Sequence, residues 1–343
     1  MKGKMMKKEL IKAMHFHMFD LNVNVTTQTT EGQSLSVEMK TFYDKTLIRL
    51  AEAKLIHDQF GQKRNIPKNG GKTIEFRQFP ALPKALTPLT EGVTPDGRKL
   101  NATSITATVS QYGDYVATSD MLQLTAIDNI AKETLTLIAS QAGRTLDTIT
   151  REVLCGGTNV RYVNSKTSRD NIASTDVLTV KDIKKAVRDL KTKNAETING
   201  CYVALIHPDA VYDIWNDDEW IAASRYAGSE QLFKGEIGKI FGVRFVESTE
   251  AKIWSHEYTP SGGSKTVTPV YGTIVLGANA FGTTTVEGGG LETIVKQLGS
   301  GGTADPLNQR ATVGWKAVKT AVRLVEEYMV RIEHSATLSS SAN

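Results

Sequence analysis

Hydrophobic residues follow a helical period along one long stretch of the chain. From Thr125 onward, an apolar residue recurs every three or four positions, which places these residues on one face of a helix. They are Ala131, Leu135, Ile138, Ala142, Leu146, Ile149 and Val153. A capping pattern at 125–128 and the pair Gly156-Gly157 mark the two ends. At about 1.5 Å per residue, the pattern predicts one helix of about 45 Å. The alternative is two shorter helices that meet at Gly143.

A strand period appears on both sides of a proline-rich segment. Apolar and polar residues alternate over residues 73–77 and again over residues 105–110, which predicts two strands. Residues 80–102 lie between them and contain four of the nine prolines, a composition that breaks helices and long strands. Long loops within a domain usually serve a function or a partner. We therefore predict a projecting hairpin. Because an isolated two-stranded hairpin is only marginally stable in water, we expect it to lie on another surface.

Short helices and strands alternate in the second half of the chain. The pattern predicts helices that begin near Thr179 and at His207-Pro208. It also predicts buried strands over residues 202–206, 242–246 and 270–276. This alternation is typical of a compact α/β unit.

The remaining segments show weaker patterns. Residues 21–35 are polar and predict an extended arm without a core, and residues 36–55 return to a helical spacing. Residues 311–334 fit either a helix or, because of their β-branched content, two strands. The serine-rich residues 338–343 predict a frayed tail.

Composition and charge narrow the functional classes. The chain has 343 residues, a length that suits about two domains. Residues 1–12 contain five lysines and one glutamate, a sum of +4 that equals the whole formal net charge. The rest of the chain is neutral overall, which does not support a protein built to grip phosphates. No apolar run approaches the roughly 18 residues that a membrane span needs. Cys155 and Cys201 are expected to be small buried residues.

Motifs of known chemistry are incomplete. Asn69–Thr73 ends like a phosphate-binding loop, but Ile66 stands where the first glycine is needed. His256-Glu257 begins a zinc-protease motif, but Pro260 replaces the second histidine. The nucleophile motif Gly-x-Ser-x-Gly does not occur. The sequence therefore predicts no enzyme, no cofactor and no metal site.

Six blocks stand in a fixed order between residues 34 and 335. They read SVEMKTFYDKT (36–46), DQFGQKR (58–64), NGGKTIEFR (69–77), PLTEGVTPDG (88–97), VSQYGDY (109–115) and LDTITRE (146–152). Together they resemble the major capsid proteins of tailed bacteriophages. Residues 1–33 fall outside the resemblance.

The resemblance implies an α+β fold, the capsid fold of the Hong Kong-phage type. In that fold, each segment of the chain would have a separate place. The segments are an N-terminal extension (1–33), an arm with a peripheral-domain helix (34–70), the projecting hairpin or E-loop (71–118), the spine helix with the peripheral domain (119–176), an axial domain (177–310), and closing strands of the peripheral domain with a tail (311–343). The resemblance also favours strands for residues 311–334.

The function that the resemblance implies is self-assembly. Hexamers and pentamers of the chain would form an icosahedral shell around double-stranded DNA, assembled in the host bacterial cytoplasm and found in the virion. Implied partners are other copies of the chain, scaffolding, portal and decoration proteins, and DNA through weak non-specific contact, with no membrane. One alternative is the shell of a cellular nanocompartment similar to encapsulins. The other is an α/β enzyme that uses residues 177–310.

The predicted contact residues lie at the tip of the hairpin, where apolar and charged side chains alternate. They are Lys84, Leu86, Leu89, Glu91, Val93, Asp96, Arg98 and Lys99. Apolar residues there would lie on an adjacent subunit, and exposed ion pairs would each contribute about 0–1 kcal/mol. Gly71 and Gly113 flank the hairpin and are expected to act as hinges. The alternative is a solvated loop whose charges only keep it soluble.

Overall fold

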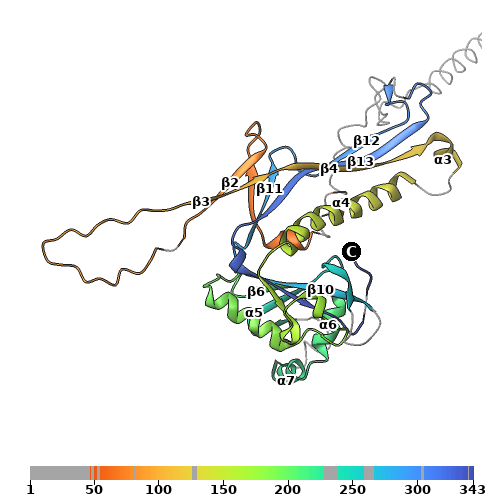
Figure 1. The fold of residues 1–343 in the computed structure, drawn as a ribbon. Coiled ribbons are helices and arrows are strands. Elements are labelled where there is room, and N and C mark those ends of the chain that lie inside the picture. The colour runs from red at the N-terminus through yellow and green to blue at the C-terminus, as the bar shows by residue number, and fades with distance from the viewer. Residues whose placement is uncertain are drawn as a thin grey trace, which may run out of the picture.

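The computed structural model describes most of the chain beyond the N-terminal region. The described residues are 47, 50–51, 55–80, 82–125, 130–227, 238–258, 266–302, 305–338 and 340–343. The predicted N-terminal extension and arm, and most of the helix predicted over 36–55, therefore lie outside the described residues. In the described part, three sheets and one long helix dominate the molecule (Figure 1).

A seven-stranded sheet forms the centre of the lower unit in Figure 1. Its strand order is β5-β14-β10-β6-β8-β7, and β9 pairs with β10. The strands are β5 (Val160–Tyr162), β6 (Tyr202–Ile206), β7 (Lys239–Ile240), β8 (Val243–Glu247), β9 (Ile253–Tyr258), β10 (Thr266–Leu276) and β14 (Met329–His334). All five residues of β6 are buried, because the strand lies between β10 and β8 with packed side chains on both faces.

Three helices accompany this sheet: α5 (Val180–Thr192), α6 (Pro208–Trp215) and α7 (Asp218–Ala227). Helix α5 buries its apolar stripe, including Ile183 and Leu190, against β6, β8, β10 and β14. Helix α6 begins with proline in its first turn, and the His207 side chain accepts a hydrogen bond from the Asp209 amide at 3.2 Å. The predicted strand over 202–206 and the predicted helix starts near Thr179 and His207 are confirmed.

A five-stranded sheet forms the upper unit. Its order is β1-β11-β13-β12, and β4 also pairs with β13. The strands are β1 (Gln62–Ile66), β4 (Ser110–Ser119), β11 (Phe281–Val286), β12 (Glu292–Lys296) and β13 (Arg310–Arg323). The long β13 pairs with β4 from Arg310 to Lys319, so that β4 is held along its whole length.

The long helix α4 (Ile130–Cys155) packs on this sheet through its predicted apolar stripe. Leu135, Ile138 and Leu146 are buried in one cluster with Trp315 of β13. The helix continues through Gly143, so the single-helix prediction is confirmed and the two-helix alternative is wrong. A short helix, α3 (Asp120–Thr125), precedes it, and residues 126–128 of the predicted cap lie outside the described residues.

The two large sheets group the strands differently from the predicted axial and peripheral ranges. Strands β11 and β12 fall within the predicted axial range 177–310, but they pair in the five-stranded sheet with β13. Strand β14 falls within the predicted closing range 311–343, but it pairs with β10 and β5 in the seven-stranded sheet. Sheet pairing joins strands that are distant in the chain, so a boundary drawn along the sequence cannot show it. The two-strand alternative for 311–334 is confirmed, with a 3-10 turn at Glu326–Tyr328 between the strands.

The serine-rich tail is not frayed where the structure describes it. The Ser340 amide donates to the Tyr271 hydroxyl at 2.7 Å, and the Ser340 hydroxyl donates to Asp209 at 2.6 Å. Asn343 accepts a hydrogen bond from the Ile253 amide at 3.1 Å. The tail finds these partners on α6, β9 and β10, elements that its own sequence cannot reveal. No described helix is both long enough and apolar enough to cross a membrane.

Candidate functional site

The root of the predicted hairpin is anchored on the five-stranded sheet. Strands β2 (Thr73–Gln78) and β3 (Thr103–Thr108) pair antiparallel, with Thr73 opposite Thr108. The buried ring of Phe76 lies against Gly282 of β11, where an added Cβ would stand 2.8 Å from the ring. The Arg64 guanidinium lies 5.4 Å from the centre of the same ring. Phe76 therefore fixes the base of the hairpin to the body.

Beyond this root, the hairpin has no core. The described residues between 79 and 102 are all exposed, and this segment extends away from the rest of the molecule (Figure 1). Its large apolar side chains are 57–83% exposed: Phe79, Leu82, Leu86, Leu89, Val93 and Leu100. Burying one such side chain fully is worth about 1.5–3 kcal/mol, and none of them gains that from the described part of the chain.

All eight predicted contact residues lie together on this exposed segment. Its charged residues form no ion pair with another described residue: Lys84, Glu91, Asp96, Arg98 and Lys99. The tip turns at Gly92, whose φ is +76°, and the Val93 amide donates to the Thr90 carbonyl at 3.1 Å. Because these charges have no partner in the described part of the chain, they are available to a second molecule.

The two predicted hinge glycines have different surroundings. Gly71 has a φ of +88° and nothing within 4 Å of the position that a Cβ would occupy, so the backbone there suits a hinge. Gly113 pairs with Lys316 inside the β4–β13 ladder, and an added Cβ would stand 2.6 Å from the Trp315 carbonyl oxygen. The structure contradicts a hinge at Gly113, because this glycine permits close strand packing. The hairpin therefore ends near Val109, and residues 110–118 belong to the five-stranded sheet.

The sequence analysis missed a second surface, a groove along α4. Its volume is about 700 Å³, and Tyr112, Leu137, Gln141 and Arg144 are among its lining residues. Leu137 is 70% exposed, although it lies on a helix whose other leucines at 135 and 146 are buried. The one signal of this groove in the sequence is Leu137, an apolar residue that lies outside the helical stripe. The hairpin projects from one side of the molecule, and α4 runs along the other side (Figure 1).

One cluster of ionisable side chains lies between α6, β10 and the tail. Asp209 accepts hydrogen bonds from the Tyr271 hydroxyl at 2.7 Å and from Ser340, and its carboxylate lies 3.3 Å from His207 Nδ1. Burial, together with the bond to Asp209, raises the pKa of Tyr271 to about 12. Burial lowers the pKa of His334, whose ring stacks on Tyr271, to about 4. Both groups are uncharged at neutral pH, so the cluster provides packing and hydrogen bonds.

The described part of the chain also shows no reactive thiol and no cluster of metal-ligating side chains. Cys155 and Cys201 are buried and form no disulfide, and burial raises the pKa of Cys155 to about 12. A thiol with such a pKa carries almost no nucleophilic thiolate. Among the described residues, no three His, Cys, Asp or Glu side chains gather in a way that could hold a metal ion.

The comparisons with family models and with solved structures both give matches to this chain. A family model described as "Phage capsid protein" matches residues 138–297, which run from within α4 to just beyond β12. No curated protein sequence matches the chain.

Solved structures match over nearly the whole chain. The capsid of Ralstonia phage GP4 has a TM-score of 0.61 at 14% identity, over 83% of this chain and 89% of that one. The capsid of Cyanophage P-SCSP1u has a TM-score of 0.63 at 13% identity, over 91% and 94%. The capsid of Cyanophage Pam1 has a TM-score of 0.64 at 12% identity, over 94% and 99%. This chain has the phage capsid fold.

The predicted resemblance to phage capsid proteins and the predicted α+β capsid fold are thereby confirmed. In the two cyanophage capsids the match extends over more than nine tenths of this chain. The contact role of the hairpin tip stays a prediction.

Proposed function

We propose that this chain is the major capsid protein of a tailed phage and that it assembles through its hairpin. Copies would form hexamers and pentamers of an icosahedral shell around double-stranded DNA. One observation carries the proposal: a molecule with the phage capsid fold exposes a hairpin whose large apolar residues have no core of their own. Such a segment reaches a low free energy only when another surface covers it.

The positions of the two surfaces suit a head-to-tail contact. The hairpin projects from one side, and α4 runs along the other side (Figure 1), with the groove lined in part by its residues. When each copy uses both surfaces, the contact repeats, and it closes into a ring if the rotation between copies allows. Leu86 and Leu89 would lie against Leu137 and Tyr112 of the next copy. Gly71, with its open surroundings, lets the hairpin adjust to the different angles of hexamers and pentamers.

Other partners follow from the charge of the chain. Because the residues beyond the first twelve sum to zero charge, contact with packaged DNA would be weak and non-specific. Scaffolding, portal and decoration functions would come from separate proteins, and assembly would take place in the host bacterial cytoplasm. An enzyme that uses residues 177–310 gains no support from the comparisons, because the matched structures are capsids.

Electron microscopy of the purified full chain tests the proposal. The double variant Leu86→Asp, Leu89→Asp places charges where the hairpin should meet its neighbour, and Leu86→Met, Leu89→Met is the matched apolar control. We expect closed or tubular lattices from the wild type and the control, and small discrete particles from the charged variant. Lattices from the charged variant would refute the contact role of the hairpin.

Mixing variants tests the head-to-tail geometry. A hairpin variant keeps its groove, and the groove variant Leu137→Asp keeps its hairpin. A mixture should form dimers, since one intact contact remains, but no rings or shells, and analytical ultracentrifugation would detect this.

Particles that contain double-stranded DNA, as opposed to cargo enzymes, would separate the phage shell from a cellular nanocompartment.

A further inference from the structure

Phe241 occupies a backbone position that suits it poorly. Phe241 and Gly242 form the two-residue turn between β7 and β8, and their φ angles are +49° and +77°. Such a turn prefers asparagine, aspartate or glycine at its first position, and a bulky side chain there is strained. At every other described non-glycine position with positive φ, the chain has Asn or Ser. The Phe241 ring is 45% exposed, so core packing does not explain the choice.

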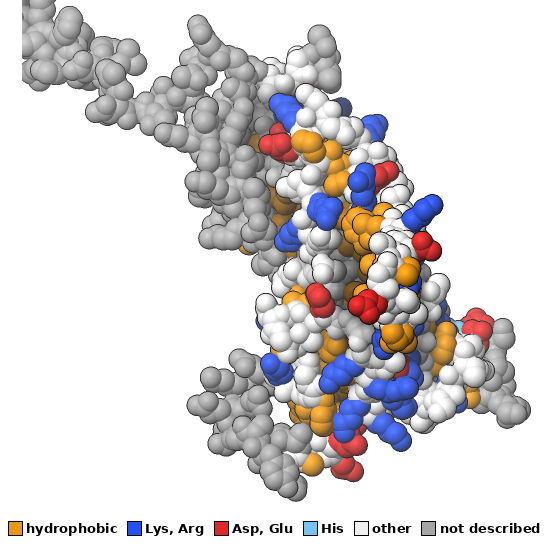
Figure 2. Space-filling model, turned by 90° about the vertical axis from the view of Figure 1, so that its left-hand side faces the viewer, with side chains coloured by type: hydrophobic (Ala, Val, Ile, Leu, Met, Phe, Trp, Pro, Cys, Tyr) orange, Lys and Arg blue, Asp and Glu red, His pale blue; other side chains and the backbone are white. Residues whose placement is uncertain are grey.

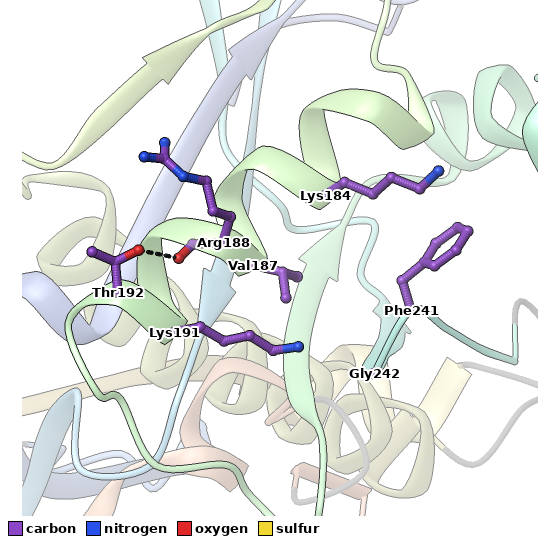
Figure 3. A pocket seen from close by; sticks show the side chains of 7 residues that line it. All are labelled: Lys184, Val187, Arg188, Lys191, Thr192, Phe241 and Gly242. Atoms are coloured by element: carbon purple, nitrogen blue, oxygen red, sulfur yellow. Dashed lines mark hydrogen bonds between the residues drawn. The ribbon is translucent and has the colours of Figure 1, made fainter.

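The ring forms one wall of a groove, and α5 forms the other (Figure 3). The groove has a volume of about 740 Å³, and its described lining includes Lys184, Val187 and Lys191. The Lys184 ammonium lies 4.1 Å from the centre of the Phe241 ring. In Figure 3, Lys184 and Lys191 extend from α5 toward the side of Phe241, whereas Arg188 points away from it. The groove thus combines an apolar wall with two cations.

The positive charge of the groove is only partly neutralised. No acidic residue is among the described residues that line it. Lys191 forms no ion pair with another residue in the described ranges, while Lys184 pairs with Glu219 at 2.7 Å. Figure 2 views the molecule from the side toward which the hairpin projects, and Lys and Arg side chains gather on its lower part. An anionic partner would therefore find uncompensated charge here.

We propose that this groove binds an acidic, amphipathic segment of a partner protein. Apolar side chains of the segment would contact Phe241 and Val187, and its carboxylates would pair with Lys184 and Lys191. A nucleic acid duplex fits less well, because it presents no unstacked base to the ring. Strain at a turn that holds an exposed aromatic ring is typical of a binding site. The site is separate from the hairpin and from the groove along α4.

Fluorescence anisotropy with the full chain tests this site. The probe is a fluorescein-labelled synthetic peptide, Glu-Glu-Leu-Phe-Glu-Leu-Glu, and the same peptide with lysine in place of glutamate is the probe control. The double variant Lys184→Glu, Lys191→Glu should weaken binding about tenfold. Lys63→Glu, Lys68→Glu makes the same charge change on exposed residues of the distant β1 region and should leave affinity unchanged.

Phe241→Gly separates binding from folding. Glycine adopts a positive φ without strain, so the melting temperature should stay equal or rise. Peptide affinity should fall, because the apolar wall is lost. A purely structural role for Phe241 would give the reverse, a lower melting temperature with unchanged affinity, and would overturn the proposal.

Four further results would also overturn it. The acidic peptide could fail to bind, or the control lysine pair could weaken binding as much as the groove pair. Duplex DNA could displace the peptide at physiological salt and bind more tightly, which would assign the groove to nucleic acid. Self-association that disappears in the Lys184→Glu, Lys191→Glu variant, without peptide binding, would assign it to a second copy of the chain.

Discussion

The hairpin and the seven-stranded sheet use apolar residues in opposite ways. In the sheet, all five residues of β6 are buried between neighbouring strands and packed side chains. In the hairpin, Leu86 and Leu89 are 83% and 77% exposed. The sheet therefore obtains its hydrophobic stabilisation within one copy, whereas the hairpin obtains none from the described part of the same chain. In the proposed assembly, stability of the single chain and stability of the shell would reside in different regions.

The largest expected effect comes from a buried hydrogen-bonded pair in the body. Asp147 of α4 accepts hydrogen bonds from the His57 amide at 2.8 Å and from His57 Nδ1 at 2.7 Å, and both side chains are buried. Asp147→Ala leaves two buried donors without an acceptor, at about 1–3 kcal/mol each, and should lower the free energy of unfolding by about 4 kcal/mol. Glu75→Ala removes an exposed pair with Arg77 on the hairpin and should cause no measurable change in urea unfolding. Equal losses of unfolding free energy in the two variants would contradict the difference between the body and the hairpin.

A pair of leucines separates the two kinds of stability. Leu205→Ala in β6 should lower the free energy of unfolding by about 3 kcal/mol, because it leaves a cavity in a packed core. Leu86→Ala should leave unfolding of the single chain unchanged and reduce the yield of assembled particles. Chemical denaturation and light scattering measure the two quantities. A large loss of single-chain stability in Leu86→Ala would mean that the hairpin is covered by its own chain.

Acid should weaken the sheet through His334. Burial lowers the pKa of His334 from 6.5 to about 4, so the neutral ring is favoured in the folded chain. The contribution of the neutral ring to the free energy of unfolding is fully present above pH 6.5 and is lost as the pH falls toward 4. The total loss is about 3 kcal/mol. His207, whose pKa burial also lowers, acts in the same direction.

Comparing urea unfolding of the wild type and His334→Gln between pH 8 and pH 4 measures this contribution. The variant should show a smaller loss of stability over that interval, whatever its stability at pH 8. An unchanged pH dependence would contradict the role of the buried ring. The hairpin contains no histidine, and the difference between wild type and variant isolates the contribution of His334 in β14.

The smallest expected effect concerns the tail. Ser340→Ala removes the hydrogen bond to Asp209 and should cost about 1 kcal/mol of unfolding free energy. Ser341→Ala, at an exposed neighbouring position, is the control and should change nothing. Limited proteolysis should cut the tail faster in Ser340→Ala than in the control. Equal cleavage rates would mean that the tail contributes nothing to the sheet.

Local patterns in the sequence determined the elements of this fold. The stripe that includes Leu135, Ile138 and Leu146 specified a single long helix, because a period of three to four places these residues on one face. The prolines between 80 and 102 specified an exposed hairpin, because they break both helix and sheet. Each of these signals lies within a short window of the chain.

Tertiary structure decided everything that depends on distant partners. Gly113 could be a hinge or a close contact, and only the Trp315 carbonyl beside it settles which. The same holds for β14, which joins the sheet of β10, and for Ser340, which is held by Asp209. The groove that presents Leu137 exists only once α4 lies on its sheet. A sequence states what each segment prefers, but pairing and packing between remote segments depend on the free energy of the whole fold.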